Sequence, residues 1–395
     1  MKKLVKNNVN WVGKIDWELR SIHGDELSTY NGTSYNAYLI EEEKTVLVDT
    51  VWAHFGEEFV ENLTSEIDLK KIDYIVANHG EIDHSGGLPA LMKHIPDTPI
   101  YCTANAVKSI KGHYHQDWNF KVVKTGDKLD IGNGKELVFV EMPMLHWPDS
   151  MATYMTGDNI LFSNDAFGQH YAHEGLFNDL ADPCDLNREA MKYYANILTP
   201  FSAMLRKKLD EIIGLGLTID IIATSHGVIW RDNPMQIVEK YSSWANDYQE
   251  NQITIVYDTM WNGTKRMAEK IAEGIELADP EVEVKLFNLA KSDHNDVMLE
   301  VFKSKLVAVG SPTINNGALR TVAAFVYFMK ELKLKKKKAA SFGCYGWSGE
   351  ATKAVNEMLE NAGLEVVDEG IRMLWSPDQD MLKDAVEFGK KLANA

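Results

Sequence analysis

The sequence predicts an α/β protein with two domains, and three observations support this prediction. The chain has 395 residues, and because domains usually span ~100–200 residues, two or three domains are expected. In the first part of the chain, short apolar runs lead repeatedly into polar loops, which is typical of a layered α/β or β-sandwich domain. From Ile253 onward, strand and helix patterns alternate regularly, which indicates a doubly wound parallel sheet.

The first domain is predicted to contain strand pairs followed by mixed strands and helices. Tyr35–Ile40 and Thr45–Asp49 are β-rich runs joined by the charged turn Glu41–Lys44, and Ile72–Ala77 is a short apolar strand that runs up to His79. Further strands with the same character are expected at Pro99–Thr103, Lys121–Lys124, Leu137–Glu141, Ile160–Ser163 and Ile219–Ala223.

The polar segment Tyr241–Gln252 separates the two patterns. We therefore expect one domain over residues 1–250 and a second over residues 251–395. The second domain should contain five strand–helix units in chain order, namely Ile253–Tyr257 and Lys265–Leu277, Val282–Phe287 and Asp293–Lys303, Leu306–Val309 and Thr321–Leu332, Ala339–Phe342 and Glu350–Ala362, and a strand near Leu364 before Gln379–Leu392.

Composition excludes several classes of protein. The net charge of -17 argues against general nucleic-acid binding, which needs a basic surface. No apolar run approaches the roughly 20 residues of a membrane span, and the first residues lack the apolar core of a secretion signal. The three cysteines include no CxxC pair, so a disulfide framework or a four-cysteine metal site within this chain is excluded. An odd cysteine count fits a reducing, cytoplasmic location.

The densest chemical signal is a cluster of four potential metal ligands directly after an apolar strand. His79, Glu81, Asp83 and His84 fall within six residues. Alternate residues of an extended chain point the same way, so the first three would converge if the chain stays extended. His84 is offset by one position and would need the turn at residues 85–87 to bring it round. The alternative is a polar loop with incidental titratable groups.

Three later residues have the same context, a strand that ends before a polar loop. They are His146, Asp165 and His226. Individually, each is more typical of a hydrogen-bonded structural residue than of a ligand. Together with the cluster they supply three histidines and three carboxylates, with His84 as an addition, and this set suits two metal ions.

Three loops of the second domain predict a mononucleotide site. The first, residues 257–264, precedes a helix, and helix N-termini bind phosphate. It matches neither the P-loop nor the dinucleotide pattern GxGxxG. In a sheet of order 2-1-3-4-5, the loops after the first, third and fourth strands meet at one ligand. The candidate cofactor-binding residues are Thr259, Met260, Trp261, Asn262, Gly263, Thr264, Ser311, Pro312, Thr313, Asn315, Asn316, Gly343, Tyr345, Gly346, Trp347, Ser348 and Gly349.

The HxExDH cluster, followed by single His, Asp and His residues at these intervals, resembles the metallo-β-lactamase-like domain of flavodiiron proteins. The second domain resembles the flavodoxin domain of the same family. The resemblance implies an αββα sandwich followed by a flavodoxin-like doubly wound sheet. It also implies FMN and two iron ions per chain as cofactors. Glu81 stands where the hydrolases of this fold carry a histidine, and a carboxylate-rich site suits iron rather than zinc.

The resemblance also implies a role for each candidate ligand. His79, Glu81 and His146 would hold one iron, Asp83 and His226 the other, and Asp165 would bridge the pair. Relatives differ in whether the residue at the position of His84 reaches the metal, so the role of His84 stays open. Three more residues are expected in the pocket or behind the ligands, namely His23, His170 and Tyr193. For each of these, a purely structural role is the alternative.

The function implied by the resemblance is the reduction of nitric oxide to nitrous oxide, or of dioxygen to water, with electrons delivered through FMN. The chain ends at Ala395 without the paired CxxC motifs of a rubredoxin module, so we expect rubredoxin or a similar reduced protein as the donor. A head-to-tail homodimer or a homotetramer is implied as well. Two alternatives remain, a zinc-dependent hydrolase of lactamase fold fused to a flavodoxin domain, and a non-catalytic flavin electron carrier.

Overall fold

The computed structural model describes residues 2–214 and 216–395 and divides into two compact units. The first unit comprises Met1–Tyr193 and Phe201–Ser242, and the second comprises Tyr194–Pro200 and Ser243–Ala395. The short segment Tyr194–Pro200 therefore belongs to the second unit, although the chain returns to the first unit after it.

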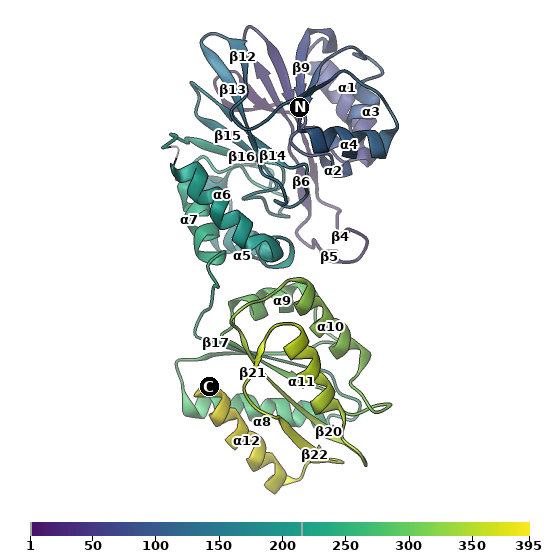
Figure 1. The fold of residues 1–395 in the computed structure, drawn as a ribbon, viewed down its shortest axis with the longest axis vertical. Helices are drawn as coiled ribbons and strands as arrows, with labels where there is room; N and C mark the ends of the chain where they lie inside the picture. The colour runs from purple at the N-terminus through teal and green to yellow at the C-terminus, as the bar shows by residue number, and fades with distance from the viewer. Residues whose placement is uncertain (1, 215) are drawn as a thin grey trace. The chain divides into compact units, whose positions relative to one another are not determined.

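Two sheets form the first unit, as Figure 1 shows. Among the described residues, the larger sheet has the order β1-β2-β7-β8-β9-β10-β11 and the smaller one runs from β12 to β16. The strands of the larger sheet are β1 (Lys3–Lys6), β2 (Val9–Trp11), β7 (Tyr38–Glu41), β8 (Thr45–Val48), β9 (Ile72–Val76), β10 (Ile100–Cys102) and β11 (Phe120–Val122). Those of the smaller sheet are β12 (Lys128–Gly132), β13 (Lys135–Glu141), β14 (Met151–Met155), β15 (Ile160–Asn164) and β16 (Ile221–Thr224). Two short pairs join β3 (Lys14–Asp16) to β6 (Thr33–Tyr35) and β4 (Ser21–Ile22) to β5 (Leu27–Ser28).

Side-chain alternation explains why β7 is apolar along its length. Tyr38 and Ile40 enter the core between the two sheets, whereas Leu39 enters a second core beneath the helices. Successive residues of a strand point to opposite faces, and both faces of this sheet are covered. A strand buried on both faces reads as a continuous apolar run, which is why the sequence pattern located it.

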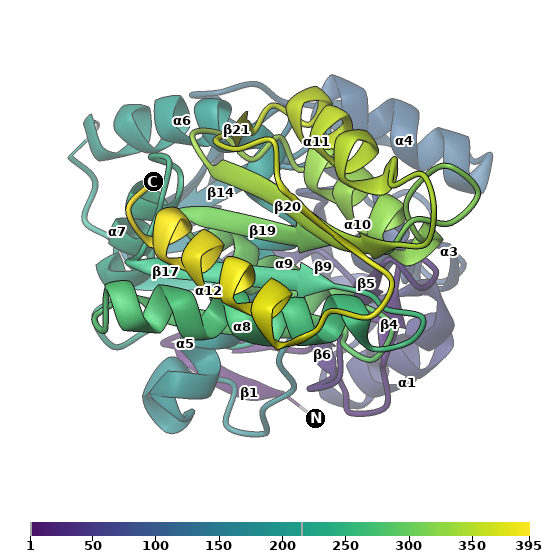
Figure 2. The same cartoon turned by 90° about the horizontal axis from the view of Figure 1, so that it is seen from below.

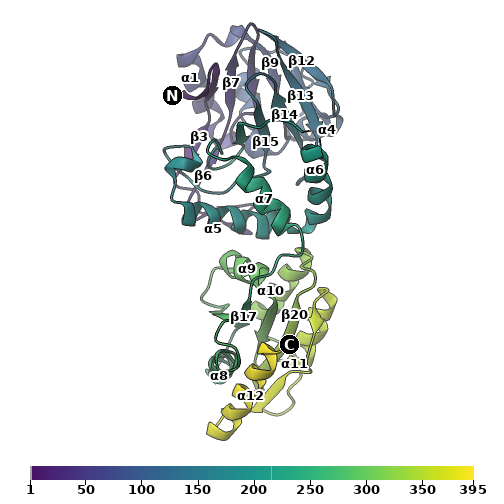
Figure 3. The ribbon, with the colours of Figure 1, turned by 90° about the vertical axis from the view of Figure 1, so that its left-hand side faces the viewer.

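Helices cover the outer face of each sheet, so the first unit is an αββα sandwich and the predicted fold class is confirmed. On the larger sheet lie η1 (Ala53–Phe55), α1 (Gly56–Glu66), η2 (Leu69–Lys71), α2 (Ile82–Ser85), α3 (Leu88–Leu91) and α4 (Ala104–Tyr114). The later helical segments are η3 (Asn178–Leu180), α5 (Pro183–Tyr193), η4 (Tyr194–Leu198), η5 (Thr199–Phe201), α6 (Ser202–Gly214) and α7 (Met235–Trp244). Side chains of α6 and α7 pack against β15, and Figure 3 shows both helices beside the smaller sheet.

The second unit is a parallel sheet with the order β18-β17-β19-β20-β21, in which β22 also pairs with β20. This is the predicted 2-1-3-4-5 arrangement. Its elements are β17 (Gln252–Tyr257), α8 (Gly263–Ala278), β18 (Glu283–Asn288), α9 (His294–Lys303), β19 (Leu306–Gly310), α10 (Arg320–Glu331), β20 (Lys338–Tyr345), α11 (Ala351–Asn361), β21 (Glu365–Val366), β22 (Ile371–Leu374) and α12 (Gln379–Ala393). Figure 2 shows α8 and α12 side by side. The two helices pack closely at Gly274. A Cβ atom there would lie 2.0 Å from the Val386 carbonyl oxygen, so a residue without a side chain is needed at this position.

The lysine run before β20 contains one buried cation. Lys337 is 3% exposed, and its Nζ donates to the carbonyl oxygens of Tyr248, Phe302 and Ser304 at 3.2, 2.6 and 2.8 Å. Burial lowers the pKa of Lys337 to about 7, while three acceptors match the three N–H groups of an ammonium. Lys337 therefore helps to anchor the segment that precedes β17.

A buried ion network joins the two sheets of the first unit and gives a stability prediction. Lys135 Nζ lies 2.6 Å from Glu42 Oε1 and 2.8 Å from Asp158 Oδ2, and the carboxylate side chains are only 1% and 3% exposed. Lys135→Met would leave both carboxylates buried without their cation. We expect it to lower the free energy of unfolding by about 2–4 kcal/mol at neutral pH, measured by urea denaturation of the loaded protein.

A matched control and a pH series test this prediction. Lys128 pairs with Glu136 at 2.7 Å, but both side chains are exposed, so Lys128→Met should cost less than about 1 kcal/mol. Burial opposes ionisation of Glu42, but hydrogen bonds from Lys135 and two asparagines lower its pKa from 4.5. The stabilisation is thus present above pH 4.5 and is lost as the pH falls below it, so the gap between wild type and Lys135→Met should shrink there. Equal costs for the two variants would contradict the account.

Within the residues that the structure describes, no helix is both long enough and apolar enough to cross a membrane.

Candidate functional site

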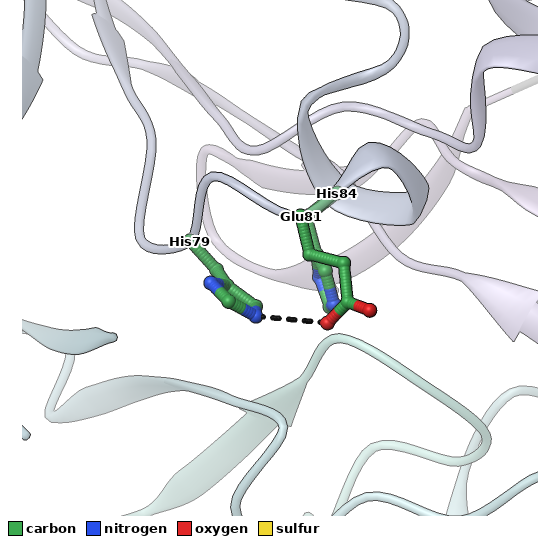
Figure 4. Close-up of side chains that lie close together, drawn as sticks. All are labelled: His79, Glu81 and His84. Carbon is green, nitrogen blue, oxygen red and sulfur yellow. Dashed lines mark hydrogen bonds and ion pairs between the residues drawn. The ribbon is translucent and has the colours of Figure 1, made fainter. Parts of the chain in front are cut away.

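The predicted ligand cluster lies where β9 ends in the first unit. His79 is the third residue after the strand, and Glu81 precedes a single helical turn, α2, which carries Asp83 and His84. The extended conformation, on which the predicted convergence of the first three residues was conditional, therefore ends at Glu81. The turn is what brings His84 to the same side, and Figure 4 shows His79, Glu81 and His84 pointing toward one another.

Three other loops bring the remaining candidate ligands to the same place. Asp165 follows β15 and His226 follows β16, and these two strands are parallel neighbours. Their carboxyl ends therefore open at one edge of the smaller sheet. His146 comes from the loop between β13 and β14. All seven candidate ligands thus converge, although they lie up to 147 positions apart in the printed sequence, from His79 to His226.

Three side chains surround the Oδ2 atom of Asp165 and form, together with it, a group of four potential ligands. His79 Nε2 lies 3.7 Å and His146 Nε2 lies 3.5 Å from this oxygen. Glu81 Oε2 lies 3.1 Å from His79 Nε2 and 3.6 Å from His146 Nε2. Two imidazoles and two carboxylate oxygens therefore face a common centre.

Three further side chains surround the other oxygen of the same carboxylate and form, together with it, a second group of four. Asp165 Oδ1 lies 3.2 Å from His84 Nε2 and 3.4 Å from His226 Nε2. Asp83 contributes Oδ1 at 3.4 Å from His84 Nε2 and Oδ2 at 3.3 Å from His226 Nε2. Because Asp165 presents one oxygen to each group, it is placed to bridge two cations.

The two groups fit metal ions. Metal bonds of about 2.0–2.2 Å separate neighbouring ligand atoms by about 2.8–3.1 Å in octahedral geometry and about 3.3–3.6 Å in tetrahedral geometry. The separations between nitrogen and oxygen here are similar, at 3.1–3.7 Å. Asp83 Oδ1, His84 Nε2 and both oxygens of Asp165 are buried without a hydrogen-bond partner among the described residues. Buried polar atoms without partners are costly, and a pair of cations would satisfy all four.

Electrostatics favour the same conclusion. Burial opposes ionisation of Asp165, but the neighbouring imidazoles of His84 and His226 outweigh it and hold the pKa of this carboxyl well below its usual range. Burial likewise opposes the protonation of His226, but the nearby carboxylates of Asp165 and Asp83, 3.4 and 3.3 Å from its Nε2 atom, raise its pKa to about 10. The pocket therefore concentrates negative charge that needs a positive partner, which protons supply here and metal ions can replace.

Groups behind the ligands fix the orientation of two imidazoles. Asp149 accepts from His79 Nδ1 at 3.1 Å and from the Gly80 backbone N–H at 2.8 Å. His226 Nδ1 donates to the Ser34 carbonyl oxygen at 2.8 Å. In both residues the Nδ1 atom is engaged, so the lone pair of Nε2 can face the pocket, as it does in metal-binding histidines. The sequence did not predict Asp149 or Ser34, because each lies far along the chain from its partner.

The three predicted outer residues are all near the ligands. His23 stands in the β4–β5 hairpin, and its Nε2 lies 2.8 Å from Glu81 Oε1, the oxygen that faces away from the first group. The ring of His170 lies 5.1 Å from that of Tyr193 and 5.2 Å from that of His226, centroid to centroid. Burial lowers the pKa of His170 to about 3, so its imidazole is neutral.

A separate cavity of about 440 Å³ opens at the carboxyl ends of β17, β19 and β20 in the second unit. Its lining includes thirteen of the predicted cofactor residues: Thr259, Met260, Trp261, Gly263, Thr264, Pro312, Thr313, Asn315, Asn316, Tyr345, Gly346, Trp347 and Ser348. Four predicted residues do not line it: Asn262, Ser311, Gly343 and Gly349. Four lining residues were not predicted: Ile314, Cys344, Trp375 and Ser376.

The four predicted residues outside the lining shape the loops instead. Asn262 is the residue before α8 and has a φ of +64°. The Ser311 hydroxyl accepts from the Leu319 backbone N–H at 2.9 Å. A Cβ atom on Gly343 would lie 1.8 Å from the Ser311 carbonyl oxygen, so only glycine lets the third and fourth loops approach. Gly349 has a φ of +79°, which favours glycine.

The cavity offers a phosphate group free donors. Helix α8 begins at Gly263 without a side-chain cap, so its first N–H groups are open to a ligand. The hydroxyls of Thr259 and Thr264 are buried and have no hydrogen-bond partner among the described residues. Exposed indoles stand at the cavity, since Trp261 is 88% and Trp347 is 84% exposed. A phosphate at the helix and a flat ring between aromatic side chains would satisfy this site.

Comparison with known proteins agrees with the geometry. Residues 33–227 match the family model described as ODP family beta lactamase, and residues 255–389 match the flavodoxin family model. The chain is 57% identical over 394 residues to the anaerobic nitric oxide reductase flavorubredoxin of Escherichia coli K12, spanning 100% of this chain and 82% of that protein.

Two solved structures share both units. The rubredoxin oxygen:oxidoreductase of Desulfovibrio gigas has a TM-score of 0.95 and 36% identity, with 100% of this chain and 98% of that one covered. The flavodiiron protein of Giardia intestinalis has a TM-score of 0.95 and 34% identity, with 100% and 96% covered. The chain therefore belongs to the flavodiiron protein family and is an oxidoreductase, as the sequence resemblance implied.

Proposed function

We propose that this protein reduces nitric oxide to nitrous oxide, and dioxygen to water, at a di-iron centre in its first unit, with electrons delivered through FMN in its second. The single observation that carries the proposal is the Asp165 carboxylate, whose two oxygens each face a separate group of nitrogen and oxygen ligands. When bound, FMN and the two irons supply the redox chemistry, and the protein supplies position and surroundings.

The proposed ligand assignment follows the two groups. His79, Glu81 and His146 would hold one iron together with Asp165 Oδ2. The other iron would be held by Asp83, His226 and Asp165 Oδ1. His84 faces this second group at 3.2 Å from Asp165 Oδ1, which supports counting it as a ligand. Carboxylate oxygens in both groups favour iron over zinc, because they are hard and anionic.

The outer residues would act on the ligands and on the bound gas. His23 would hold Glu81 Oε1, which leaves Oε2 to the metal and keeps this ligand monodentate. Burial, and then the charge of Asp165, raise the pKa of Tyr193 far above its usual value, so its hydroxyl keeps its proton and can donate a hydrogen bond in the pocket. The neutral His170 would pack beside Tyr193, with its Nδ1 3.0 Å from the Thr33 hydroxyl.

FMN would occupy the cavity at the end of the parallel sheet. Its phosphate would lie at the start of α8 against Thr259 and Thr264, and its ring would lie between the loops that carry Pro312 and Tyr345. We place the FMN-binding domain at residues 251–395 and the di-iron domain at residues 1–250. The exposed Trp261 and Trp347 beside the cavity support a partner that covers the flavin.

Rubredoxin or a similar reduced protein is the proposed donor, and a head-to-tail homodimer or a homotetramer is the proposed assembly. In such a pairing, the flavin of one copy faces the metals of another. The name of the Escherichia coli relative includes both nitric oxide reductase and flavorubredoxin, which supports nitric oxide as the preferred substrate and a rubredoxin-type donor.

The test is turnover of the iron-loaded, FMN-loaded protein with reduced rubredoxin as the donor. The solution is prepared anaerobically, and each gas is then added in a separate assay. The proposal expects steady consumption of nitric oxide with nitrous oxide as product, and slower consumption of dioxygen. Faster steady turnover with dioxygen would reverse the substrate preference. Zinc in the site together with hydrolysis of a lactam or thioester would replace the proposal by the hydrolase alternative.

A further inference from the structure

A cavity in the first unit lies away from the candidate metal ligands, and among the described residues only apolar side chains line it. Its volume is about 160 Å³, and it lies between helices α6 and α7 and strand β15. Leu161, Phe167, Leu209 and Val238 form its inner part and are at most 5% exposed. Ile213 and Leu217 form its rim and are 52% and 39% exposed. The cavity is thus an apolar funnel that narrows from the surface into the unit.

Such a cavity selects a particular kind of guest. Apolar cavities stay dry because water finds no hydrogen-bond partners there, and a dry cavity of about 150 Å³ can bind xenon or benzene. Nitric oxide and dioxygen are small and nearly apolar, so they prefer such surroundings to water. An ionic or strongly polar guest would lose its hydration without compensation.

The inner end of the funnel leads toward the metal ligands through aromatic side chains. The ring of Phe167 lies 4.8 Å from that of Tyr241. Tyr241 is close enough to Tyr193 to contribute to the raised pKa of its hydroxyl, after burial and Asp165. The Tyr193 ring lies 6.5 Å from that of His226, one of the proposed iron ligands. Phe167, which lines the cavity, thus lies two residues after Asp165 and beside Tyr241, whereas Tyr193 lies near His226. We refer to Phe167, Tyr241 and Tyr193 together as the aromatic wall.

The backbone holds the first residue of this wall in an unusual conformation. Phe167 has a φ of +69°, in the left-handed region that a bulky residue seldom adopts. Its carbonyl oxygen accepts from Trp230 Nε1 at 2.9 Å and from Gln169 Nε2 at 3.2 Å. These two bonds fix the backbone two residues after Asp165 and place the ring in the wall. Strained conformations that the surroundings maintain are concentrated at functional sites.

We propose that this cavity is a holding site for the dissolved gas substrate and that gas reaches the metals from it through the Phe167–Tyr241–Tyr193 wall. The inference rests on the proposed function for the identity of the gas. The cavity binds one apolar molecule at a time and raises the local gas concentration behind the metal ligands. Changes in the side-chain rotamers of these aromatic residues open the path between the cavity and the ligands.

The first experiment tests binding alone. Crystals of the FMN- and iron-loaded protein are exposed to xenon gas under pressure, and xenon is located by its anomalous scattering. The expected result is a xenon atom in contact with Leu161, Leu209 and Val238. An absence of xenon there, or a longer acyl chain or a second copy of the protein filling the funnel, would overturn the proposal. This result does not depend on catalysis.

The second experiment tests delivery with a matched pair of variants on α6. Ile213 lies on the rim and is 52% exposed, whereas Met204 is 51% exposed on the same helix and does not line the cavity. Ile213→Trp should lower kcat/KM for nitric oxide by about threefold to tenfold by narrowing the entry. Its kcat at saturating gas and its iron and FMN content should not change. Met204→Trp should match the wild type in every respect.

The outcomes separate this inference from the proposed function. If wild-type protein consumes neither gas, the proposed function fails, and the delivery role falls with it. If it consumes gas and xenon binds, but Ile213→Trp and Met204→Trp have equal kcat/KM, only the delivery role is overturned. A lower kcat/KM in Ile213→Trp alone, with xenon in the cavity, supports the proposal.

Discussion

Asp165→Asn is expected to remove the di-iron centre and to lower nitric oxide consumption by about a thousandfold or more, because metal-dependent chemistry requires the metals. Asparagine has the same shape as aspartate, but it replaces one ligand oxygen by an N–H₂ group that donates and cannot bind a cation. Each oxygen of Asp165 faces two imidazole nitrogens. The variant therefore loses a ligand in one group and the anionic bridge in both. Iron analysis of the purified variant and gas consumption by an electrode measure the effect.

Asp149→Asn is the matched control for this experiment. Asp149 is as deeply buried as Asp165, at 1% exposure, but it contacts Nδ1 of His79 and not the space between the groups. Loss of such a partner behind a ligand typically costs about 10–100-fold in metal affinity or activity. We therefore expect Asp165→Asn to lose far more iron and gas consumption than Asp149→Asn, and both variants to retain FMN. Two irons per chain in Asp165→Asn would contradict the bridging role.

Gly343→Ala is expected to weaken FMN binding by about a hundredfold or more, through a clash of the kind that costs several kcal/mol. The new Cβ atom would lie 1.8 Å from the Ser311 carbonyl oxygen and 2.8 Å from its carbonyl carbon. Both of these are backbone atoms, so the loop after β19 must move away from the loop after β20. Pro312 and Tyr345 line the FMN cavity from these two loops. Flavin fluorescence titration of the apoprotein measures the affinity.

Gly317→Ala is the control within the same set of loops. Its Cβ atom would meet only the Ile314 carbonyl oxygen at 3.9 Å, which is an ordinary contact. This variant should bind FMN like the wild type, and both variants should retain iron in the first unit. Normal FMN affinity in Gly343→Ala would show that the loops can separate without opening the cavity, and the account of Gly343 would fail.

The second unit was predictable almost element by element. From Ile253 to Ala362, the observed bounds of each strand and helix lie within a few residues of the predicted ones. The reason is physical, since the central strands β17, β19 and β20 are buried almost throughout and the helices carry one apolar face, so both patterns are strong in the sequence. The exception is the last strand, which is divided into β21 and β22. That division is why Trp375 and Ser376, which follow β22, were not predicted as part of the cavity.

The first unit was less predictable because its sequence signals are weaker. Strands β7, β8, β9, β13 and β15 lie where the apolar runs predicted them, but β1, β2, β12 and β14 were not predicted. β1 and β2 are short and interrupted by Asn7 and Asn8, and asparagine is depleted in strands. In β14, Met151–Met155 is buried at every position, so it shows no alternation. Such a run cannot be assigned to strand or helix from its pattern.

The candidate metal ligands could be identified from the sequence, but their geometry could not. Local spacing identified His79, Glu81, Asp83 and His84, because four ligands in six residues are unusual. The helical turn that carries Asp83 and His84 was missed, since four residues are too few to show a helical period. The arrangement around Asp165 depends on the parallel pairing of β15 and β16, which is a long-range contact that spacing along the chain does not encode.

The central claim is that one carboxylate joins two iron sites, and anomalous X-ray scattering tests it most directly. Crystals of the loaded protein are measured just above and just below the iron absorption edge. The account predicts two iron peaks, one among His79, Glu81 and His146 and the other among Asp83, His84 and His226, with Asp165 between them. A single metal peak, or peaks whose height does not change across the iron edge, would contradict it.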